Sequence, residues 1–325
     1  MSGAAAPRVQ AHDFTPDVES FRDDVLRGLA LPQKEIPAKY FYDARGSELF
    51  EEICGLEEYY PTRTETALLR KVASEIADRV GPNAVLIEYG AGATQKVRIL
   101  LDRLEVPAAF IPIDISGEHL LQAAESLAAD YPRLQIVPVA ADYTERFDLP
   151  VPGGLASARK VVFFPGSTIG NFSKPEAKDF LEKSAALLAG GGEMIVGVDL
   201  KKDERILLDA YNDAKGVTAR FNLNLLARIN SEIGADFDLT AFEHHAPWNA
   251  EAGRIEMHLV SRVRQSVTVA GRQFEFAAGE SIHTENSHKF TVEEFQDLAR
   301  SAGFHPVTVW TDERDLFSIH YLRAG

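Results

Sequence analysis

Hydrophobic and polar positions follow two alternating periods through the middle of the chain. Strand-length apolar runs occupy residues 85–88, 110–115, 135–139, 160–164 and 194–200, and helical spacing marks residues 96–104, 118–129 and 173–188. Strands that alternate with helices are joined by right-handed crossovers in one sheet. The pattern therefore predicts an open, mostly parallel, doubly wound α/β sheet.

The pattern differs on both sides of this alternation. Helical spacing runs from Thr15 to about Leu31, whereas the first fourteen residues predict no element. After Lys202 the chain reads as largely helical to Glu232, and two strand-like stretches, 254–263 and 266–276, then predict a hairpin. A helix from Thr291 and a strand pair at 306–310 and 315–322 follow. An insertion at about 201–287 thus interrupts the α/β core.

Three helices carry a sequence signature for their start. A Ser or Thr with a Glu three residues later predicts a capping box, in which the two residues satisfy each other's backbone N–H groups. The pairs are Thr62 with Glu65, Ser173 with Glu176, and Thr291 with Glu294. We expect a helix to begin at each pair.

Composition narrows the class of protein. The chain has 325 residues, 45% hydrophobic and 26% charged, as in soluble globular proteins of about two domains. A lone cysteine, Cys54, excludes an internal disulfide and fits a reducing compartment. The N-terminus lacks signal-peptide features, and no apolar run approaches the ~18 residues that span a bilayer. We expect a cytoplasmic protein without membrane contact.

Charge and histidine spacing exclude two further classes. Asp and Glu total 49 against 34 Lys and Arg, a net charge of −15, which repels phosphate backbones and disfavours nucleic-acid binding. The nine histidines lack zinc-type spacing with other ligands, so we expect no metal. Nothing in the pattern predicts assembly, and we expect a monomer.

A glycine turn at the first predicted strand suggests a cofactor. Glu88, Gly90 and Gly92 form an E-x-G-x-G motif, and Gln95 stands where the dinucleotide fingerprint has its third glycine. The E-x-G-x-G form is the one that S-adenosylmethionine-dependent methyltransferases use. Asp114 ends the next strand, where a carboxylate suits ribose hydroxyls of either cofactor. A nicotinamide-linked oxidoreductase and a purely structural turn remain the alternatives.

Two other strand ends carry polar or flexible residues. Asp142 and Tyr143 follow the third strand, where methyltransferases usually seat adenine. Gly166, Gly170 and Asn171 follow the fourth, in a loop that suits close approach of a ligand. A plain turn before the Ser173 cap explains that loop equally well.

At this point the chain resembles the L-histidine Nα-methyltransferases of ergothioneine biosynthesis. The motifs that carry the resemblance are YFYD (40–43) with GS (46–47), LEEYYPTRTE (56–65), GSTIGN (166–171), Tyr211 with GVT (216–218), DFDL (236–239), RIEM (254–257) and TENS (284–287). The resemblance implies a Rossmann-like class I methyltransferase sheet, residues 65–200 plus 288–325, that binds S-adenosylmethionine. It implies a second, α+β substrate-binding domain from residues 15–64 plus 201–287.

The resemblance also implies site residues. The histidine site would contain Tyr42, Tyr59, Gly166, Asn171, Tyr211, Met257, Glu285 and Ser287, and the cofactor site Gly90, Lys96, Asp114, Asp142 and Tyr143. Two positions depart from the family pattern: Tyr143, where phenylalanine is common, and Ala91, where serine is frequent. Neither departure touches the acceptor pocket.

The implied chemistry is trimethylation of the α-amine of L-histidine. Tyr42 and Asn171 would orient the amine; Tyr42 is a weak candidate base, because a phenol has a pKa of about 10. Glu285 and Ser287 alternate along an extended stretch, so both can face the imidazole, one accepting from a ring N–H and the other serving the second nitrogen. Another aromatic amino acid, such as a tryptophan derivative, and a non-catalytic cofactor-binding module remain alternatives.

Overall fold

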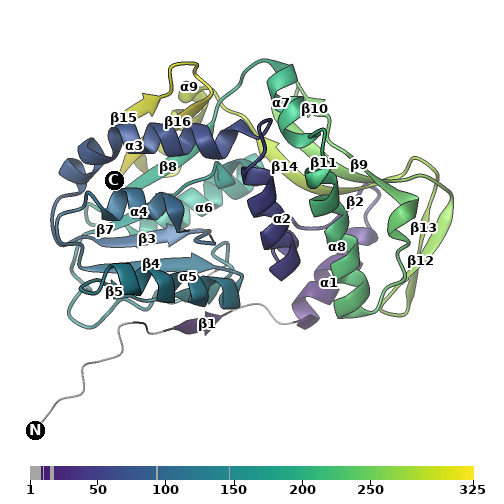
Figure 1. The fold of residues 1–325 in the computed structure, drawn as a ribbon, viewed down its shortest axis with the longest axis horizontal. Helices are drawn as coiled ribbons and strands as arrows, with labels where there is room; N and C mark the ends of the chain where they lie inside the picture. Colours follow the sequence, from purple (N-terminus) through teal and green to yellow (C-terminus); the bar gives the residue numbers. More distant parts are fainter. Residues whose placement is uncertain (1–8, 10, 15–17, 93, 146) are drawn as a thin grey trace, which may run out of the picture.

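Two sheets lie side by side, each with its own helices (Figure 1). The computed structural model describes residues 9, 11–14, 18–92, 94–145 and 147–325. Within them the first sheet has nine strands, the second has five, and a two-stranded ribbon lies at the outer end of the second. The site described below lies where the two sheets meet.

The first sheet is parallel except at one edge. Along its main path the strands are, in spatial order, β1 (His12–Phe14), β6 (Val139–Ala141), β4 (Ala109–Asp114), β3 (Val85–Tyr89), β7 (Lys160–Phe164), β8 (Glu193–Asp199), β16 (Phe317–Ala324) and β15 (Phe304–Thr311), with β5 (Gln135–Ile136) beside β4. β16 pairs antiparallel with both β8 and β15. The strand order reverses beside β3, which places the ends of β3, β4 and β7 at the usual ligand edge of such a sheet.

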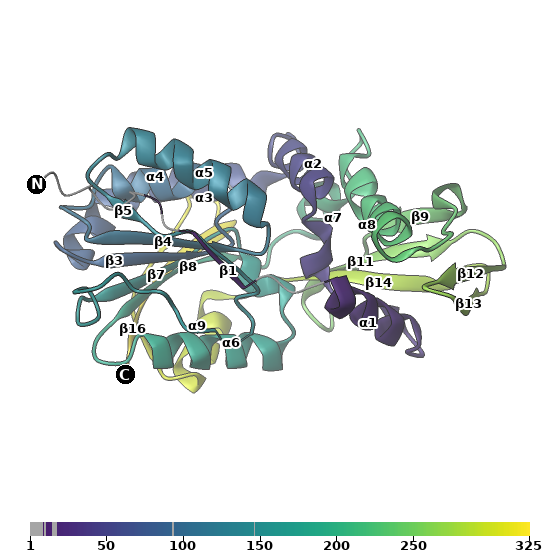
Figure 2. The ribbon, with the colours of Figure 1, turned by 90° about the horizontal axis from the view of Figure 1, so that it is seen from below.

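Helices cover both faces of the first sheet (Figure 2). One face carries α3 (Tyr60–Val80), α4 (Gln95–Leu101) and α5 (Gly117–Asp130), and the other carries α6 (Lys174–Leu187) and α9 (Val292–Ser301). The predicted capping boxes of α6 and α9 are both present. This doubly wound arrangement confirms the predicted α/β core.

The second sheet is built almost wholly from the insertion. Its strands are β10 (Trp248–Asn249), β11 (Arg254–Ser261), β14 (Ser281–His288), β9 (Phe242–His245) and, from the N-terminal segment, β2 (Lys34–Glu35). The associated helices are α1 (Val18–Leu29), η1 (Ala38–Phe41), α2 (Ala44–Cys54), α7 (Glu204–Tyr211), α8 (Val217–Ile233) and η3 (Leu239–Ala241). One hydrophobic core joins them, so the segment from Phe21 to Tyr60 and the segment from Leu207 to Ile282 pack as one unit. The fold class, a Rossmann-like sheet with a second α+β part, is confirmed.

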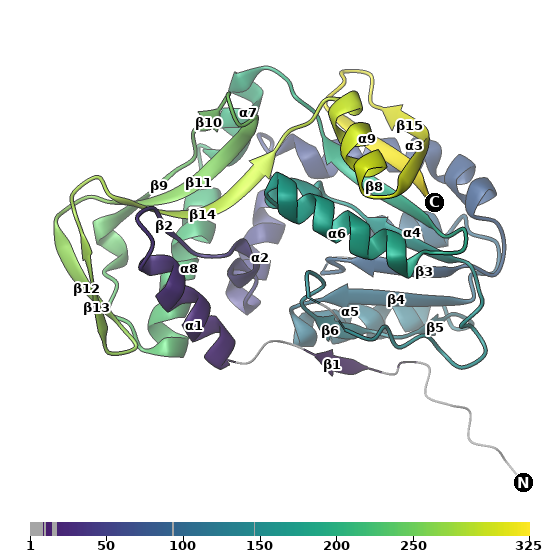
Figure 3. The ribbon, with the colours of Figure 1, turned by 180° about the vertical axis from the view of Figure 1, so that it is seen from behind.

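The chain passes between the two parts at several points. β8 leads into α7, and β14 runs out of the second sheet directly towards α9 (Figure 3). A bridge between Leu200 and Phe290 ties these two crossings together. The exact domain boundaries predicted above stay a prediction.

Two predictions about strands were wrong. The stretches 254–263 and 266–276 do not form one hairpin: β11 pairs with β9, β10 and β14, and the hairpin lies inside the second stretch, between β12 (Gln265–Val269) and β13 (Arg272–Phe276). Ala270 and Gly271, both at positive φ, make its two-residue turn. The N-terminal segment also contains an element, because β1 adds to the sheet edge beside β6.

The helix predicted to start at Thr62 begins two residues earlier. The capping box at Thr62 and Glu65 is absent: α3 begins at Tyr60, with Pro61 in its first turn, and Thr62 instead donates to Cys54 Sγ at 3.2 Å. Proline is favoured in a first helical turn, so Pro61 was the correct signal. The predicted start of the first helix at Thr15 lies outside the described residues.

Candidate functional site

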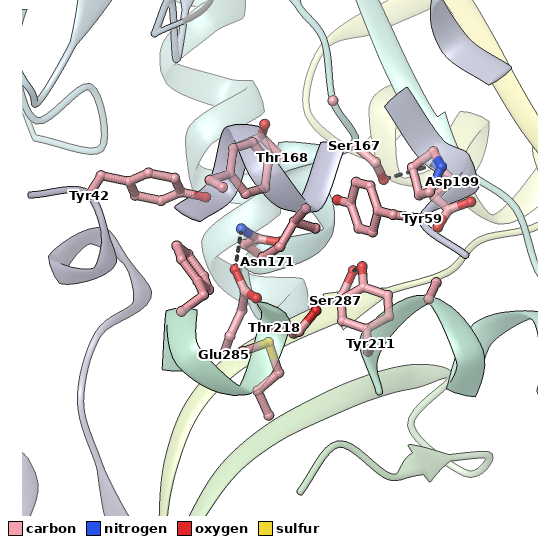
Figure 4. Close-up of a pocket in the computed structure, with 17 residues that line it drawn as sticks. Tyr42, Tyr59, Ser167, Thr168, Asn171, Asp199, Tyr211, Thr218, Glu285 and Ser287 are labelled. Atoms are coloured by element: carbon pink, nitrogen blue, oxygen red, sulfur yellow. Dashed lines mark hydrogen bonds between the residues drawn. The ribbon is translucent and has the colours of Figure 1, made fainter. Parts of the chain in front are cut away.

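A pocket lies between the carboxyl edge of the first sheet and the inner face of the second. All eight residues expected to form the histidine site line it, together with others from both parts of the chain (Figure 4). The lining residues are Tyr42, Phe50, Ile53, Tyr59, Pro61, Gly166, Ser167, Thr168, Asn171, Asp199, Ala210, Tyr211, Thr218, Phe221, Met257, Glu285 and Ser287. Residues 245 positions apart in the sequence thus face one space.

The loop after β7 brings Asn171 to the pocket. Gly166 and Ser167 both have positive φ, which turns the chain sharply into the short helix η2 (Thr168–Asn171). Gly170 packs against β14 so closely that a Cβ there would lie 2.7 Å from the carbonyl oxygen of His288. Only glycine permits this approach, which holds Asn171 against the second sheet.

A bulge in β14 aims two side chains into the same pocket. β11 pairs Met257 with Glu285 but His258 with His283, so Thr284 is an extra residue. Bulges of this kind redirect side chains and are common beside active sites. Beyond the bulge, Glu285 and Ser287 both line the pocket, as their spacing predicted.

Asn171 and Glu285 contact each other across the two sheets. Asn171 Nδ2 donates to Glu285 Oε1 at 3.0 Å (Figure 4). Burial raises the pKa of Glu285 to about 7, and the positive charge of Lys289 limits the rise. The carboxyl therefore changes protonation state near neutral pH.

A buried ionic network underlies the pocket, and no sequence motif predicted it. Lys289 Nζ contacts Asp199 Oδ2 at 2.7 Å and donates to Ser287 Oγ at 2.7 Å and Tyr211 OH at 3.0 Å. Lys202 pairs with the other Asp199 oxygen, and Tyr60 donates to the same carboxylate at 2.7 Å. Two ammonium groups and a phenol thus compensate one buried carboxylate, whose pKa stays below its usual value despite burial.

Aromatic rings form one wall of the pocket. Phe50 lies between Tyr42 and Tyr59, with ring centroids 5.7 and 6.4 Å away, and Phe221 packs beside Tyr42 at 6.0 Å. Burial raises the pKa of both tyrosines well above the usual value, and nearby Glu285 adds to the effect. Tyr42 therefore stays protonated near neutral pH, which argues against its acting as a free phenolate base.

The other expected residues gather at the carboxyl ends of β3, β4 and β6. Gly90 turns with φ +73°, and a Cβ on Gly92 would lie 3.5 Å from Asp114 Oδ2. Asp114 accepts the backbone N–H of Ser116 at 2.8 Å, and burial raises its pKa. Tyr143 packs on Tyr89 with ring centroids 5.4 Å apart.

Asp142 joins this group to the N-terminal segment. Lys39 Nζ donates to its Oδ2 at 3.0 Å, and Thr144 donates to its Oδ1 at 2.5 Å. Burial acts to raise the pKa of Asp142, but these two partners more than offset it and hold the pKa below its usual value. Asp142 is therefore ionised at neutral pH.

Glu65 connects the cofactor side to the pocket. Both its carboxylate oxygens accept the backbone N–H of Gly166 at 2.9 Å, and the same carboxylate pairs with Lys96. Sequence reasoning assigned Glu65 to a helix cap, so this role was missed. The expected cofactor residue Lys96 and the pocket loop thus share one buried anion.

The residues at these strand ends fit the cofactor that the resemblance implies. Glu88 is buried, its Oε2 has no hydrogen-bond partner among the described residues, and burial raises its pKa well above the usual value. An orphaned buried acceptor beside an open glycine turn suits the ammonium group of an amino-acid moiety. Asp114 and Asp142 offer further acceptors at neighbouring strand ends. In the described part of the chain, no group of three or more His, Cys, Asp or Glu could hold a metal ion, and no helix is long and apolar enough to cross a membrane.

The profile of a family described as SAM-dependent, histidine-specific methyltransferases matches residues 21–324. The chain belongs to this family. SAM is S-adenosylmethionine, so the family's cofactor is the one that the E-x-G-x-G motif suggested.

Three relatives illustrate the range of this similarity. A histidine N-alpha-methyltransferase of Mycolicibacterium smegmatis is 43% identical over 93% of this chain and 94% of the relative. An ergothioneine biosynthesis protein 1 of Neurospora crassa is 30% identical over 89% of this chain and 33% of the relative. A 4-dimethylallyltryptophan N-methyltransferase of Penicillium roqueforti is 29% identical over 91% of each.

Proposed function

We propose that this protein transfers methyl groups from S-adenosylmethionine to the α-amine of L-histidine, forming the trimethylated betaine hercynine as the first step of ergothioneine biosynthesis. The observation that carries the proposal is the pairing of Glu285 with Ser287 on one strand, facing one pocket. A carboxylate that accepts from one ring N–H and a hydroxyl that serves the other nitrogen match imidazole. The similarity to histidine N-alpha-methyltransferases supports the same substrate.

The cofactor site in this proposal is the edge formed by β3, β4 and β6. Gly90, Lys96, Asp114, Asp142 and Tyr143 would hold S-adenosylmethionine, with Glu88 as an added acceptor for its ammonium group. When bound, the cofactor supplies an electrophilic methyl group on a sulfonium. Residues 65–200 plus 288–325 would form this cofactor domain, and residues 15–64 plus 201–287 the histidine-binding domain.

Asn171 and Tyr42 would position the substrate amine. Because Asn171 Nδ2 is bound to Glu285, its Oδ1 is left as an acceptor for an amine N–H. Tyr42, protonated at neutral pH, offers its hydroxyl oxygen as a second partner. Displacement at a sulfonium needs a free lone pair in line with the methyl group, and orientation of this kind lowers a barrier by about 7–11 kcal/mol.

The aromatic wall suits the product charge. Three transfers leave a permanent trimethylammonium, which the faces of tyrosine and phenylalanine rings stabilise by cation–π contact. Tyr42 and Tyr59 line the pocket and flank Phe50, so they are placed for this contact. The remaining polar lining groups, Ser167, Thr168 and Thr218, would complete the contacts to the amino-acid backbone.

A tryptophan derivative fits this pocket less well. An indole offers one N–H donor and no acceptor, so Glu285 could be satisfied, but the hydroxyl pair of Ser287 and Tyr211 would have no ring acceptor for its remaining proton. A buried donor without an acceptor disfavours such a substrate. We also propose that the enzyme is a cytoplasmic monomer without a metal, in keeping with its composition.

Incubation with S-adenosylmethionine and a panel of amino acids, read by mass spectrometry, tests the proposal. We expect histidine to gain one, two and three methyl units, and tryptophan and 4-dimethylallyltryptophan to gain none. The matched variants are Glu285→Ala and Glu275→Ala, the latter on the exposed side of β13. Histidine turnover should fall only in the first, with S-adenosylhomocysteine binding kept in both. Absence of any methylated histidine with the unaltered protein would refute the proposal.

A further inference from the structure

Lys289 is a buried cation whose hydrogen-bonding capacity is fully used. Its ammonium group has three N–H donors and no acceptor. The three partners are Asp199 Oδ2 at 2.7 Å, Ser287 Oγ at 2.7 Å and Tyr211 OH at 3.0 Å. Burial acts to lower the pKa of Lys289, but the Asp199 carboxylate more than reverses this, so the group stays charged. Lys289 can therefore only donate.

The two hydroxyls that accept from Lys289 also contact each other. Tyr211 OH and Ser287 Oγ are 2.6 Å apart and share one hydrogen bond, in which either can be the donor. Two hydroxyl protons are available, and that bond uses one. Among the described residues no other acceptor binds either hydroxyl, while both side chains line the pocket. The second proton is left to point into the pocket.

We propose that Lys289 is a positioning residue that forces the Tyr211–Ser287 pair to act as a net donor of one hydrogen bond to the substrate. Both hydroxyl oxygens already accept from Lys289, so the pair prefers a substrate atom that carries a free lone pair. The inference rests on the proposed function: for L-histidine that atom is the unprotonated nitrogen of a neutral imidazole. Lys289 thereby disfavours binding of histidine with a protonated imidazole ring, because that ring has no acceptor nitrogen.

The charge of Lys289 reinforces this choice through Glu285. Burial raises the pKa of Glu285 to about 7, and Lys289 is the charged group that counters the rise. An ionised Glu285 is the form that accepts a ring N–H. The titratable or charged groups around Lys289 are Asp199 on β8, Tyr211 on α7, Glu285 and His288 on β14, and Lys202 and Tyr60, which share Asp199.

The chain offers a matched control for this role. Lys202 pairs with the same Asp199 carboxylate and is almost as buried, but its other acceptors are Tyr60 OH and the carbonyl oxygen of Leu316, both at 2.6 Å. It bonds to neither Ser287 nor Tyr211. Lys289→Met and Lys202→Met therefore each remove one ammonium partner of Asp199, and only the first frees the two hydroxyls.

The experiment compares the steady-state kinetics of these two variants with the unaltered enzyme from pH 5.5 to 9. For Lys289→Met we expect the histidine KM to rise about tenfold or more, as for loss of a charge-assisted hydrogen bond, with a smaller change in kcat. The acidic limb of kcat/KM should move to higher pH, because Glu285 loses the charge that lowers its pKa. Ionisation of free histidine is the same for every variant, so it cannot explain why the acidic limb of kcat/KM lies at a different pH in one of them.

The control variant Lys202→Met has its own expected result. Lys202→Met should keep the pH limb and a histidine KM close to that of the unaltered enzyme, and both variants should bind S-adenosylhomocysteine normally. Equal losses in the two variants, or an unmoved limb in Lys289→Met, overturn the inference. If Lys289→Met does not fold, the double variant Lys289→Met with Asp199→Asn removes the ion pair as a unit and is tested in the same way. Failure of the unaltered enzyme to methylate histidine would instead count against the proposed function.

Discussion

Asn171 donates to Glu285 across 3.0 Å, and this hydrogen bond joins a loop of the first sheet to a strand of the second. The two residues are 114 positions apart in the sequence. Among the described residues, no hydrogen-bond partner takes up the Asn171 amide oxygen or the other Glu285 carboxylate oxygen, so both can bind a ligand. The bond therefore fixes the spacing between the groups proposed to bind the amine and the ring of one substrate.

Asn171→Ala tests this coupling. The variant loses an acceptor for the amine and also a donor to Glu285, so we expect kcat/KM for histidine to fall by about 100-fold, or about 2.7 kcal/mol. Isothermal titration with S-adenosylhomocysteine should give an unchanged dissociation constant, because Asn171 lies outside the cofactor edge. A parallel loss of cofactor affinity would mean that Asn171 supports the loop rather than the substrate.

Glu285→Gln should stabilise the protein at alkaline pH. The pKa of Glu285 is raised from 4.5 to about 7, chiefly by burial, so the folded chain holds this proton more tightly than the unfolded chain. The free energy of unfolding therefore decreases as pH rises from 4.5 through 7. Glutamine does not titrate, so the variant should gain up to about 3 kcal/mol at pH 8 and little at pH 4.5.

Urea denaturation at several pH values measures this difference. Glu275→Gln is the control, because Glu275 is exposed on β13 and its replacement should leave the pH dependence unchanged. An identical pH dependence for Glu285→Gln and the unaltered protein would show that the Glu285 carboxyl is not destabilised when ionised. Loss of histidine turnover in the same variant is expected and independent of this result.

Local patterns were sufficient for much of the fold. The strand from Val85 and the helices capped at Ser173 and Thr291 are specified by nearby residues, and each formed as predicted. Nearby residues do not specify the partners of β11. It pairs with β9, β10 and β14, which share a hydrophobic core with α8, rather than with the strand that follows it in the sequence. The capping motif at Thr62 failed although a local signal, Pro61, marks the observed helix start; Tyr60 at that start is buried and donates to Asp199.

Site residues that belong to a sequence motif could be predicted. Site residues that are defined only by a distant hydrogen-bond or ion-pair partner could not. Motif resemblance identified eight residues that line one pocket. Lys289 belongs to no such motif, and Glu65, although it ends the motif at 56–65, was assigned only to a helix cap. A buried charge is recognised by its partner, and the partners here, Asp199 and Gly166, lie far away in the sequence. A lysine two residues after Ser287 was visible, but nothing local distinguishes it from a solvated one.

Asp114→Asn tests the cofactor edge. The carboxylate ends β4 and is proposed to accept from both ribose hydroxyls, whereas an amide offers only one acceptor oxygen to them. We expect S-adenosylhomocysteine affinity to fall by about tenfold, or about 1.4 kcal/mol, with thermal stability retained since burial already disfavours the charge. Asp148→Asn, at an exposed position, should change neither property. Unaltered affinity in Asp114→Asn would place the ribose elsewhere.

Gly197→Ala tests whether Glu65 holds the pocket loop. A Cβ at Gly197 in β8 would lie 2.1 Å from Glu65 Oε1 and 3.1 Å from a ring carbon of Phe317, so the Glu65 carboxylate must move away from the Gly166 N–H. We expect a loss of about 1–3 kcal/mol in the free energy of unfolding from overpacking, together with lower kcat/KM for histidine.

The matched control for this substitution is Gly153→Ala. Gly153 is exposed and a Cβ there would meet nothing within 4 Å, so both stability and activity should stay close to those of the unaltered protein. The decisive comparison is activity at a temperature where Gly197→Ala is fully folded by circular dichroism. Reduced kcat/KM under that condition assigns Glu65 a role in shaping the Gly166 loop, because a purely global effect on stability disappears once the chain is folded. Normal kcat/KM would show that the loop keeps its shape without this carboxylate.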